Sequence, residues 1–168
     1  MNRSITTRQI AAVAMMAAMY VALVMALPWL SFGPFQVRVA EALTILPVFT
    51  PFAIIGVGLG CLIANMMSPY GIMDAIVGTL ASVIAGVLSY KLRGVRFWGL
   101  PILSALSPVV VNAIVIGAML SFMYTGGLNL VVFGTYAFSV GAGQMIACVV
   151  LGLPLFKALE RTSLLTTI

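Results

Sequence analysis

The sequence predicts an all-α integral membrane protein: one domain, residues 1–168, folded as a bundle of six transmembrane helices. The composition is the first observation behind this prediction. Hydrophobic residues make up 63% of the chain and charged residues only 7%, whereas water-soluble domains carry about 25% charged residues. The second observation is a series of long apolar runs separated by proline, glycine and charge, with no internal repeat and no soluble domain among them.

The first apolar run predicts a helix at 7–27. It is longer than the core of a secretory signal and lacks a small-residue cleavage site, so we interpret it as a true membrane span. The remaining runs predict helices at 38–49, 51–67, 71–92, 98–123 and 130–159, joined on one side of the membrane by loops at 28–37, 68–70 and 124–129.

The segment 39–67 is ambiguous, because it reads either as one long helix or as two short helices broken around Pro47 and Pro51. The basic residues favour two crossings. With two crossings, Arg38 alone lies opposite the other seven: Arg3, Arg8, Lys91, Arg93, Arg96, Lys157 and Arg161. Basic residues accumulate on the cytoplasmic side of membrane proteins, so both termini are expected to be cytoplasmic, with the chain spanning the cell membrane.

The same distribution excludes nucleic acid as a partner, because the basic residues are scattered over short connecting segments and form no stripe. Metal sites and cofactors are not expected either. The chain has no histidine, and Cys61 and Cys148 both fall inside apolar runs. It also lacks a phosphate-binding loop and an arranged nucleophile and base, so we expect a non-catalytic protein whose energy source, if any, is a separate subunit.

Four polar residues, Arg38, Glu41, Asn65 and Asp74, stand in strongly apolar surroundings near the predicted outer side. A charged side chain near the bilayer centre costs roughly 2.5 to 3.5 kcal/mol, so such residues usually serve a function. Structural roles remain open for each of them. Arg38 and Glu41 can pair on one helix face, Asp74 can cap a helix start, and Asn65 can bond to the turn at 68–71.

Together with Gln144, which lies deeper in the last helix, these residues suit a planar heterocycle with adjacent N–H donors, such as a guanine-like face. A carboxylate can accept two parallel hydrogen bonds from such an edge. Aromatic residues near the same side serve either as an interfacial belt or as stacking partners for a ring. They are Trp29, Phe32, Phe35, Tyr70, Tyr124 and Tyr136.

Small residues recur every four positions in the first helix, at Ala14, Ala18, Ala22 and Ala26. In lipid, such a smooth face lets helices approach closely. It is either a docking face for a partner subunit or a packing face for the protein's own helices. Gly56 and Gly60 form a weaker pair that is expected to pack internally.

Several motifs resemble the QueT family, the substrate-binding S components of energy-coupling factor (ECF) transporters associated with uptake of queuosine precursors. The matching segments are 32–44, 60–65, 68–71 with Asp74, 78–79, 108–113 and 152–155. The resemblance implies a six-helix S component that captures a 7-deazapurine outside the cell. It also implies docking, through the alanine face, with a transmembrane coupling subunit driven by two ATPase subunits.

Arg38, Glu41, Asn65 and Asp74 fall on the family's motif positions, and so does Asn112. Two positions depart from the family pattern, since Met119 and Gln144 stand where the family often has glutamate. Both departures remove negative charge, which predicts a shift from a positively charged aminomethyl base toward a neutral cyano base or a larger queuine-like base.

Three other functions remain open at this point. The chain is alternatively an S component for another vitamin or nucleobase, a standalone channel or carrier, or a membrane enzyme acting on lipid. A carrier is expected to show repeat symmetry, and an enzyme needs a catalytic pair of residues; the sequence shows neither.

Overall fold

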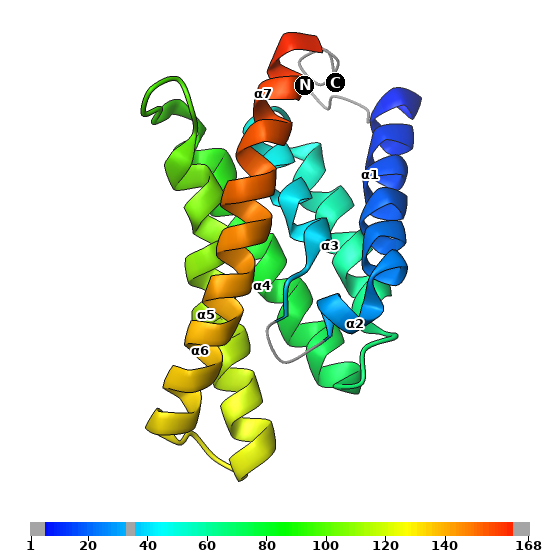
Figure 1. The fold of residues 1–168 in the computed structure, drawn as a ribbon. Helices are drawn as coiled ribbons and strands as arrows, with labels where there is room; N and C mark the ends of the chain where they lie inside the picture. The colour runs from blue at the N-terminus through cyan, green and yellow to red at the C-terminus, as the bar shows by residue number, and fades with distance from the viewer. Residues whose placement is uncertain (1–5, 33–35, 163–168) are drawn as a thin grey trace, which may run out of the picture.

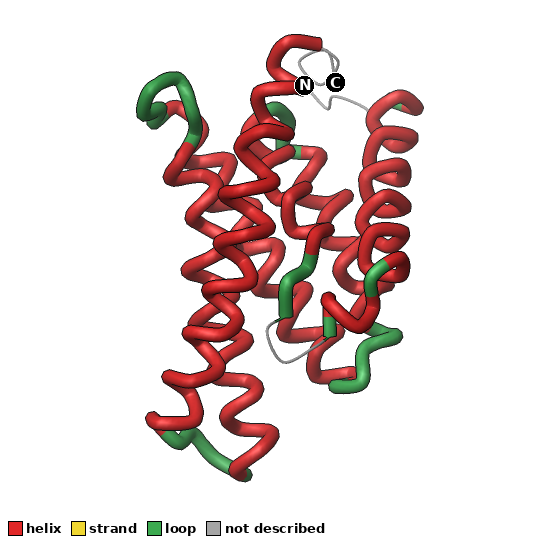
Figure 2. The backbone as a smooth tube through the Cα atoms, in the orientation of Figure 1, coloured by secondary structure: helices red, strands yellow, loops and turns green. Residues whose placement is uncertain are grey.

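The computed structural model describes residues 6–32 and 36–162, and within them the chain is helical apart from its turns, loops and one isolated bridge (Figures 1 and 2). The prediction of an all-α fold is therefore confirmed. In chain order the elements are α1 (Thr7–Ala26), α2 (Pro28–Ser31), the 3₁₀-helix η1 (Val39–Val48), α3 (Phe52–Asn65), α4 (Gly71–Lys91), the 3₁₀-turn η2 (Leu92–Gly94), α5 (Ile102–Thr125), α6 (Leu130–Gln144), the π-helix η3 (Met145–Leu151) and α7 (Gly152–Thr162).

Four stretches of the described chain are long and apolar enough to cross a membrane: α1, α4 with η2, α5, and the run of α6, η3 and α7. The apolar elements η1 and α3 are shorter. Large hydrophobic side chains on the outside of the bundle, such as Ile55, Leu80 and Phe138, are exposed. This is the surface expected for a protein that lies in lipid, where the interior is held by packing and polar contacts.

The ambiguous segment 39–67 forms two short antiparallel helices, as the basic residues had favoured. The break falls at Thr50 and Pro51, and Figure 1 shows η1 and α3 side by side in the middle of the bundle. A 3₁₀-helix rises about 2.0 Å per residue, against about 1.5 Å in an α-helix. The ten residues of η1 are therefore more extended than an α-helix of the same length.

The fifth helix begins at Ile102, so the prediction that it starts at residue 98 was wrong. Phe97 and Leu100 exchange backbone hydrogen bonds of 3.0 and 2.9 Å, which closes a tight turn. Trp98 and Gly99 occupy that turn with positive φ angles of 50° and 78°. A left-handed backbone does not propagate a right-handed helix, so the helix starts only after this turn.

The loop expected at 28–37 contains a short helix, α2, with Pro28 at its first position. Proline is favoured there because its φ angle is already helical and its missing N–H has no partner to lose. The last predicted helix, 130–159, is observed as the continuous run 130–162, but its middle is a π-helix, which the sequence did not indicate.

The first helix packs on α3 along a glycine seam. A Cβ atom added at Gly60 would lie 2.6 Å from the Cβ of Tyr20 and 2.9 Å from the carbonyl oxygen of Ala17. One added at Gly56 would lie 2.9 Å from the Cβ of Met16. The internal role expected for the two glycines is thus confirmed, and they bring α1 into backbone contact with α3.

We expect Gly60→Ala to destabilise the protein by about 1 to 3 kcal/mol, because the added methyl group meets the backbone and Cβ of α1. Thermal unfolding of the purified chain in detergent measures this effect. Gly134→Ala is the matched control, since Gly134 also lies inside a helix but has no neighbouring atom within 4 Å of an added Cβ. Equal melting temperatures for the two variants would contradict the close contact at Gly60.

Candidate functional site

A small enclosed cavity lies in the interior of the bundle. Its lining combines polar and apolar residues from four elements and the segment before η1: Gln36, Arg38, Glu41, Gly78, Ser82, Asn112, Ile116, Val140 and Gln144. The volume open to water-sized molecules is about 10 Å³, close to the minimum that holds one water molecule. A two-ring base therefore enters only when the lining moves apart.

The helices around the cavity each present two residues spaced by four. On α4 they are Gly78 and Ser82, on α5 Asn112 and Ile116, and on α6 Val140 and Gln144. Residues four apart lie on the same face of a helix, one turn above the other. The three helices thus line the cavity over one turn each, and η1 completes the wall with Glu41.

Arg38 forms a buried ion pair with Asp74. Its Nη2 lies 3.1 Å from Oδ2 of Asp74, and its Nε donates a 3.3 Å hydrogen bond to the carbonyl oxygen of Ser31. The guanidinium also lies over the ring of Phe32, 5.3 Å from its centroid. Arg38 and Asp74 are 6% and 1% exposed, so each charge is compensated almost entirely by its partners rather than by solvent.

The expected pairing of Arg38 with Glu41 is not observed. Arg38 precedes η1 with an extended backbone, φ −86° and ψ 100°. The side-chain spacing of a helix therefore does not apply to it, and its side chain extends toward α4. The capping role considered for Asp74 is not observed either, because α4 starts without a side-chain cap and the Asp74 carboxylate bonds to Arg38 instead.

Glu41 has one oxygen bound and one oxygen free. Tyr20 Oη donates a hydrogen bond of 2.6 Å to Oε1. Oε2 is buried and has no hydrogen-bond partner among the described residues. An unpaired buried acceptor is costly, and it favours any ligand that brings an N–H or O–H to it. Since Tyr20 occupies Oε1, Glu41 offers a single oxygen rather than the two parallel acceptors that the sequence suggested.

Asn65 and Asp74 lie outside the lining of the cavity. Asn65 Nδ2 donates to the backbone oxygen of Asp74 at 3.0 Å and to Cys61 Sγ at 3.4 Å. A Cβ added at Gly78 would lie 2.5 Å from this nitrogen. The glycine therefore lets Asn65 reach α4, where it ties the end of α3 to the first turn of α4. Its role is structural, but its side chain bonds to Asp74 and Cys61 and not to the turn at 68–71 that the sequence analysis considered.

Gln144 lies in the cavity wall immediately before the π-helix η3, and its Oε1 accepts a 3.2 Å hydrogen bond from Cys148 Sγ. Met119, the other departure from the family pattern, does not line the cavity. It packs instead in an apolar cluster with Leu120 and Val140. Of the two departures, only Gln144 changes the chemistry of the wall.

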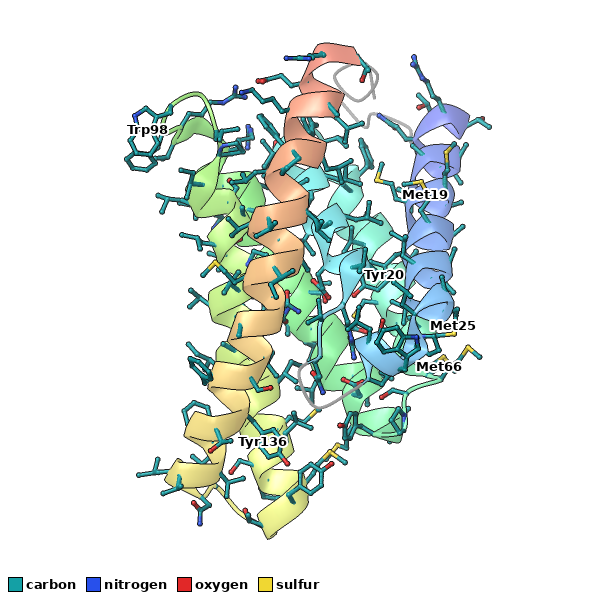
Figure 3. All side chains as sticks on the ribbon, viewed as in Figure 1. Met19, Tyr20, Met25, Met66, Trp98 and Tyr136 are labelled. Carbon is teal, nitrogen blue, oxygen red and sulfur yellow. The ribbon has the colours of Figure 1, made fainter. Side chains whose placement is uncertain are left out.

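Three polar residues that line or support the cavity were missed by the sequence analysis, namely Tyr20, Gln36 and Ser82, and so were the apolar lining residues Ile116 and Val140. Tyr20 carried a readable signal, because it is the single tyrosine in the long apolar run 7–27. Its position in the middle of that run argues against an interfacial role. Figure 3 shows Tyr20 midway along the bundle, and its side chain is fully buried.

Aromatic residues gather at the end of the bundle where α5 and α6 meet. Tyr124 and Tyr136 stack with ring centroids 5.4 Å apart, and Figure 3 places Tyr136 near this end. Burial raises the pKa of the Tyr70 phenol, and its interactions with Tyr124 raise it further. Trp29 is 72% exposed, which fits the interfacial alternative for this residue, whereas Phe35 lies outside the described residues.

The alanine face of α1 borders an open apolar groove of about 600 Å³ against α3. The groove is lined by Ala14, Ala17, Ala18, Val21, Ala22, Met25, Leu59 and Ile63. Ala14, Ala18 and Ala22 are exposed, so the helices of the described chain do not cover their side chains. Smooth grooves of this kind admit another helix at close range.

Long apolar helices around an enclosed polar cavity define a helical membrane protein that can hold a small polar molecule. The chain belongs to the QueT transporter family, whose model matches residues 10–161. A curated relative, the queuosine precursor transporter QueT of Lactococcus lactis subsp. cremoris (strain MG1363), is 38% identical over 98 residues. The match spans 55% of this chain and 57% of the relative. No solved structure matches the chain significantly.

We expect Asp74→Asn to destabilise the protein by about 3 to 5 kcal/mol, because it leaves the buried Arg38 charge without its partner. The matched control is Glu160→Gln, which removes the exposed Arg96–Glu160 pair, with Arg96 Nη1 2.6 Å from Glu160 Oε1. Exposed pairs contribute about 0 to 1 kcal/mol. Thermal unfolding in detergent compares the two; a larger loss in the control would contradict the importance of the buried pair.

Proposed function

We propose that the chain is the substrate-binding S subunit of an ECF-type ABC transporter that imports a queuosine precursor, a 7-deazaguanine or queuine-like base. One observation carries the proposal: Glu41 Oε2 is buried beside the cavity, and no residue that the structure describes gives it a hydrogen bond. The N–H edge of a guanine-type base supplies the missing donor. Membership of the QueT transporter family and the name of the Lactococcus relative support this class of substrate.

In this proposal the base lies between η1 and the helices α4, α5 and α6. Glu41 accepts one ring N–H, and the amides of Asn112 and Gln144 complete the polar edge. Arg38, which Asp74 holds in place, donates to a ring carbonyl oxygen. Asn65 acts behind the wall by fixing α3 to α4, and Asp74 acts through Arg38 rather than by touching the base.

The preferred base is neutral. Arg38 and Asp74 compensate each other, so Glu41 is the single remaining carboxylate in the described lining. Its free oxygen is used by a ring N–H, and Gln144 offers an amide where the family often has an acid. An ammonium group would therefore find no carboxylate of its own, which favours a cyano base over an aminomethyl base.

Six spans with both termini cytoplasmic agree with the arrangement of the elements. The start of α1, the loop between α4 and α5, and the end of α7 lie at one end of the bundle (Figure 1). Arg8, Lys91, Arg93, Arg96 and Arg161 belong to these segments. If the end that carries these basic residues is cytoplasmic, the opposite end, where Arg38 precedes η1, is the side from which the base enters.

The alanine groove is the docking surface in this proposal. A helix of the transmembrane coupling subunit fills it, and two separate ATPase subunits supply the energy. The groove suits a helix because its lining is apolar and its α1 side consists largely of alanines, which allow close approach. The chain itself then hydrolyses no ATP and serves as the binding subunit.

The first prediction concerns the ligand. Calorimetry of the purified chain with guanine, cyano-deazaguanine, aminomethyl-deazaguanine and queuine should show one-to-one binding, tightest for cyano-deazaguanine, because aminomethyl-deazaguanine and queuine both carry an amine that is protonated at neutral pH. We expect Glu41→Gln to weaken it by about 1.5 to 3 kcal/mol, as for a lost hydrogen bond to a charged group. Glu160→Gln is the control, because Glu160 is exposed and outside the cavity. A clear preference for the aminomethyl base would refute the neutral specificity, and no binding at all would refute the proposed substrate class.

The second prediction concerns the groove. We expect Ala18→Leu to keep normal base binding but to lose copurification with the coupling and ATPase subunits, because the larger side chain fills the groove. Ala142→Leu makes the same change on the exposed surface of α6, outside the groove, and should copurify like the unmodified chain. Unimpaired assembly of the Ala18 variant would show that docking uses another surface.

A further inference from the structure

Tyr20 links α1, which lines the alanine groove, to Glu41, which lines the cavity. The buried residues of α1 are Ala12, Met16, Ala17, Tyr20 and Val24. Among these, only Tyr20 has a polar side-chain group, and its hydroxyl donates a hydrogen bond of 2.6 Å to Glu41 Oε1. Tyr20 is 0% and Glu41 1% exposed, so water does not compete for this bond.

The groove and the hydrogen bond lie on the same stretch of α1. Ala18 and Ala22, two positions before and after Tyr20, line the groove on the outer side. On the inner side, Tyr20 lies against Gly60 of α3, where there is no room for a Cβ atom. A partner that enters the groove must touch α1 and α3 at the level where Tyr20 reaches Glu41.

We propose that Tyr20 is a positioning residue of the binding site. From α1, the helix that lines the alanine groove, it holds the Glu41 carboxylate in place, so that ligand affinity depends on the position of α1. The inference rests on the proposed function, in which Glu41 receives the base. Because Tyr20 occupies Oε1, the other oxygen is the one left for the ligand. Without this donor, the carboxylate loses its fixed orientation, and the ligand must order it on binding.

A small displacement of α1 is enough to affect the site. O–H···O hydrogen bonds weaken beyond about 3.0 Å, so a shift of α1 by less than about 1 Å breaks the bond from Tyr20 to Glu41. Occupation of the groove and occupation of the cavity then influence each other through one contact. By thermodynamic reciprocity, a partner that weakens base binding is itself bound less tightly when the base is present.

The first test is a double-mutant cycle in the chain without ligand. Thermal unfolding is measured for Tyr20→Phe, Glu41→Gln and the double variant. We expect the shift in melting temperature of the double variant to be clearly smaller than the sum of the two single shifts, because both substitutions act on the same hydrogen bond: Tyr20→Phe removes its donor, and Glu41→Gln replaces its charged acceptor by a weaker neutral one. Additive shifts would overturn the inference, since Tyr20 and Glu41 would then act independently.

The second test repeats the cycle on the Kd for cyano-deazaguanine. We expect Tyr20→Phe to raise Kd about tenfold, and the double variant to stay within about twofold of Glu41→Gln alone. Val24→Ala is the structural control, because Val24 is buried one turn further along α1. It should lower the melting temperature and leave Kd unchanged. Normal binding by Tyr20→Phe, or losses that multiply in the double variant, would overturn the inference.

The two tests separate the inference from the proposed function. If the unmodified chain binds none of the bases while the unfolding cycle still shows coupling, the proposed substrate class is refuted and Tyr20 is reduced to a packing residue. If the chain binds cyano-deazaguanine and Glu41→Gln has no effect, the role of Glu41 is refuted, and that of Tyr20 with it. If Glu41→Gln weakens binding but Tyr20→Phe does not, the inference about Tyr20 alone is wrong.

Discussion

The buried ion pair between Arg38 and Asp74 is the interaction on which the arrangement of the site depends. It joins the segment before η1 to the first turn of α4, and the chain between these two points runs through both η1 and α3. Either charge alone in an apolar bundle carries a large desolvation cost, so each stabilises the structure only where the other is present. The pair therefore fixes the start of η1, and with it the position of Glu41.

Small residues make the rest of this arrangement possible. Gly60 brings α1 close enough for Tyr20 to reach Glu41, and Gly78 leaves room for Asn65 to bond to the backbone of α4. In a membrane, where apolar surface gains little by leaving lipid, such close contacts and the hydrogen bonds they allow hold helices together. The polar contacts near the cavity thus depend on the close helix packing that the glycines allow.

Sequence patterns predicted the helices better than the contacts between them. Apolar runs and the distribution of basic residues were enough to place most helices and to divide 39–67 into two. The cost of burying charge singled out Arg38 and Glu41, which line the cavity, but it did not predict their partners. Arg38 has an extended backbone outside the helix, so helical spacing misassigned its partner. Tyr20 was missed because the sequence analysis considered charged and amide side chains and did not follow the single hydroxyl in the middle of the first apolar run.

Two of the irregular helices in the described chain, η1 and η3, lie at or next to the wall of the cavity. Glu41 lies in the first turn of the 3₁₀-helix η1, and Gln144 directly precedes the π-helix η3. Cys148 of η3 lies 3.5 Å from the backbone oxygen of Glu41 and bonds to Gln144, so the two segments also touch each other. Helices of these kinds have weaker hydrogen-bond geometry than α-helices and often occur at functional sites. The cavity is too small for a base as it stands, and because these helices have weaker backbone hydrogen bonds than the α-helices around them, we expect the wall to rearrange first at Glu41 of η1 and at Gln144, which precedes η3.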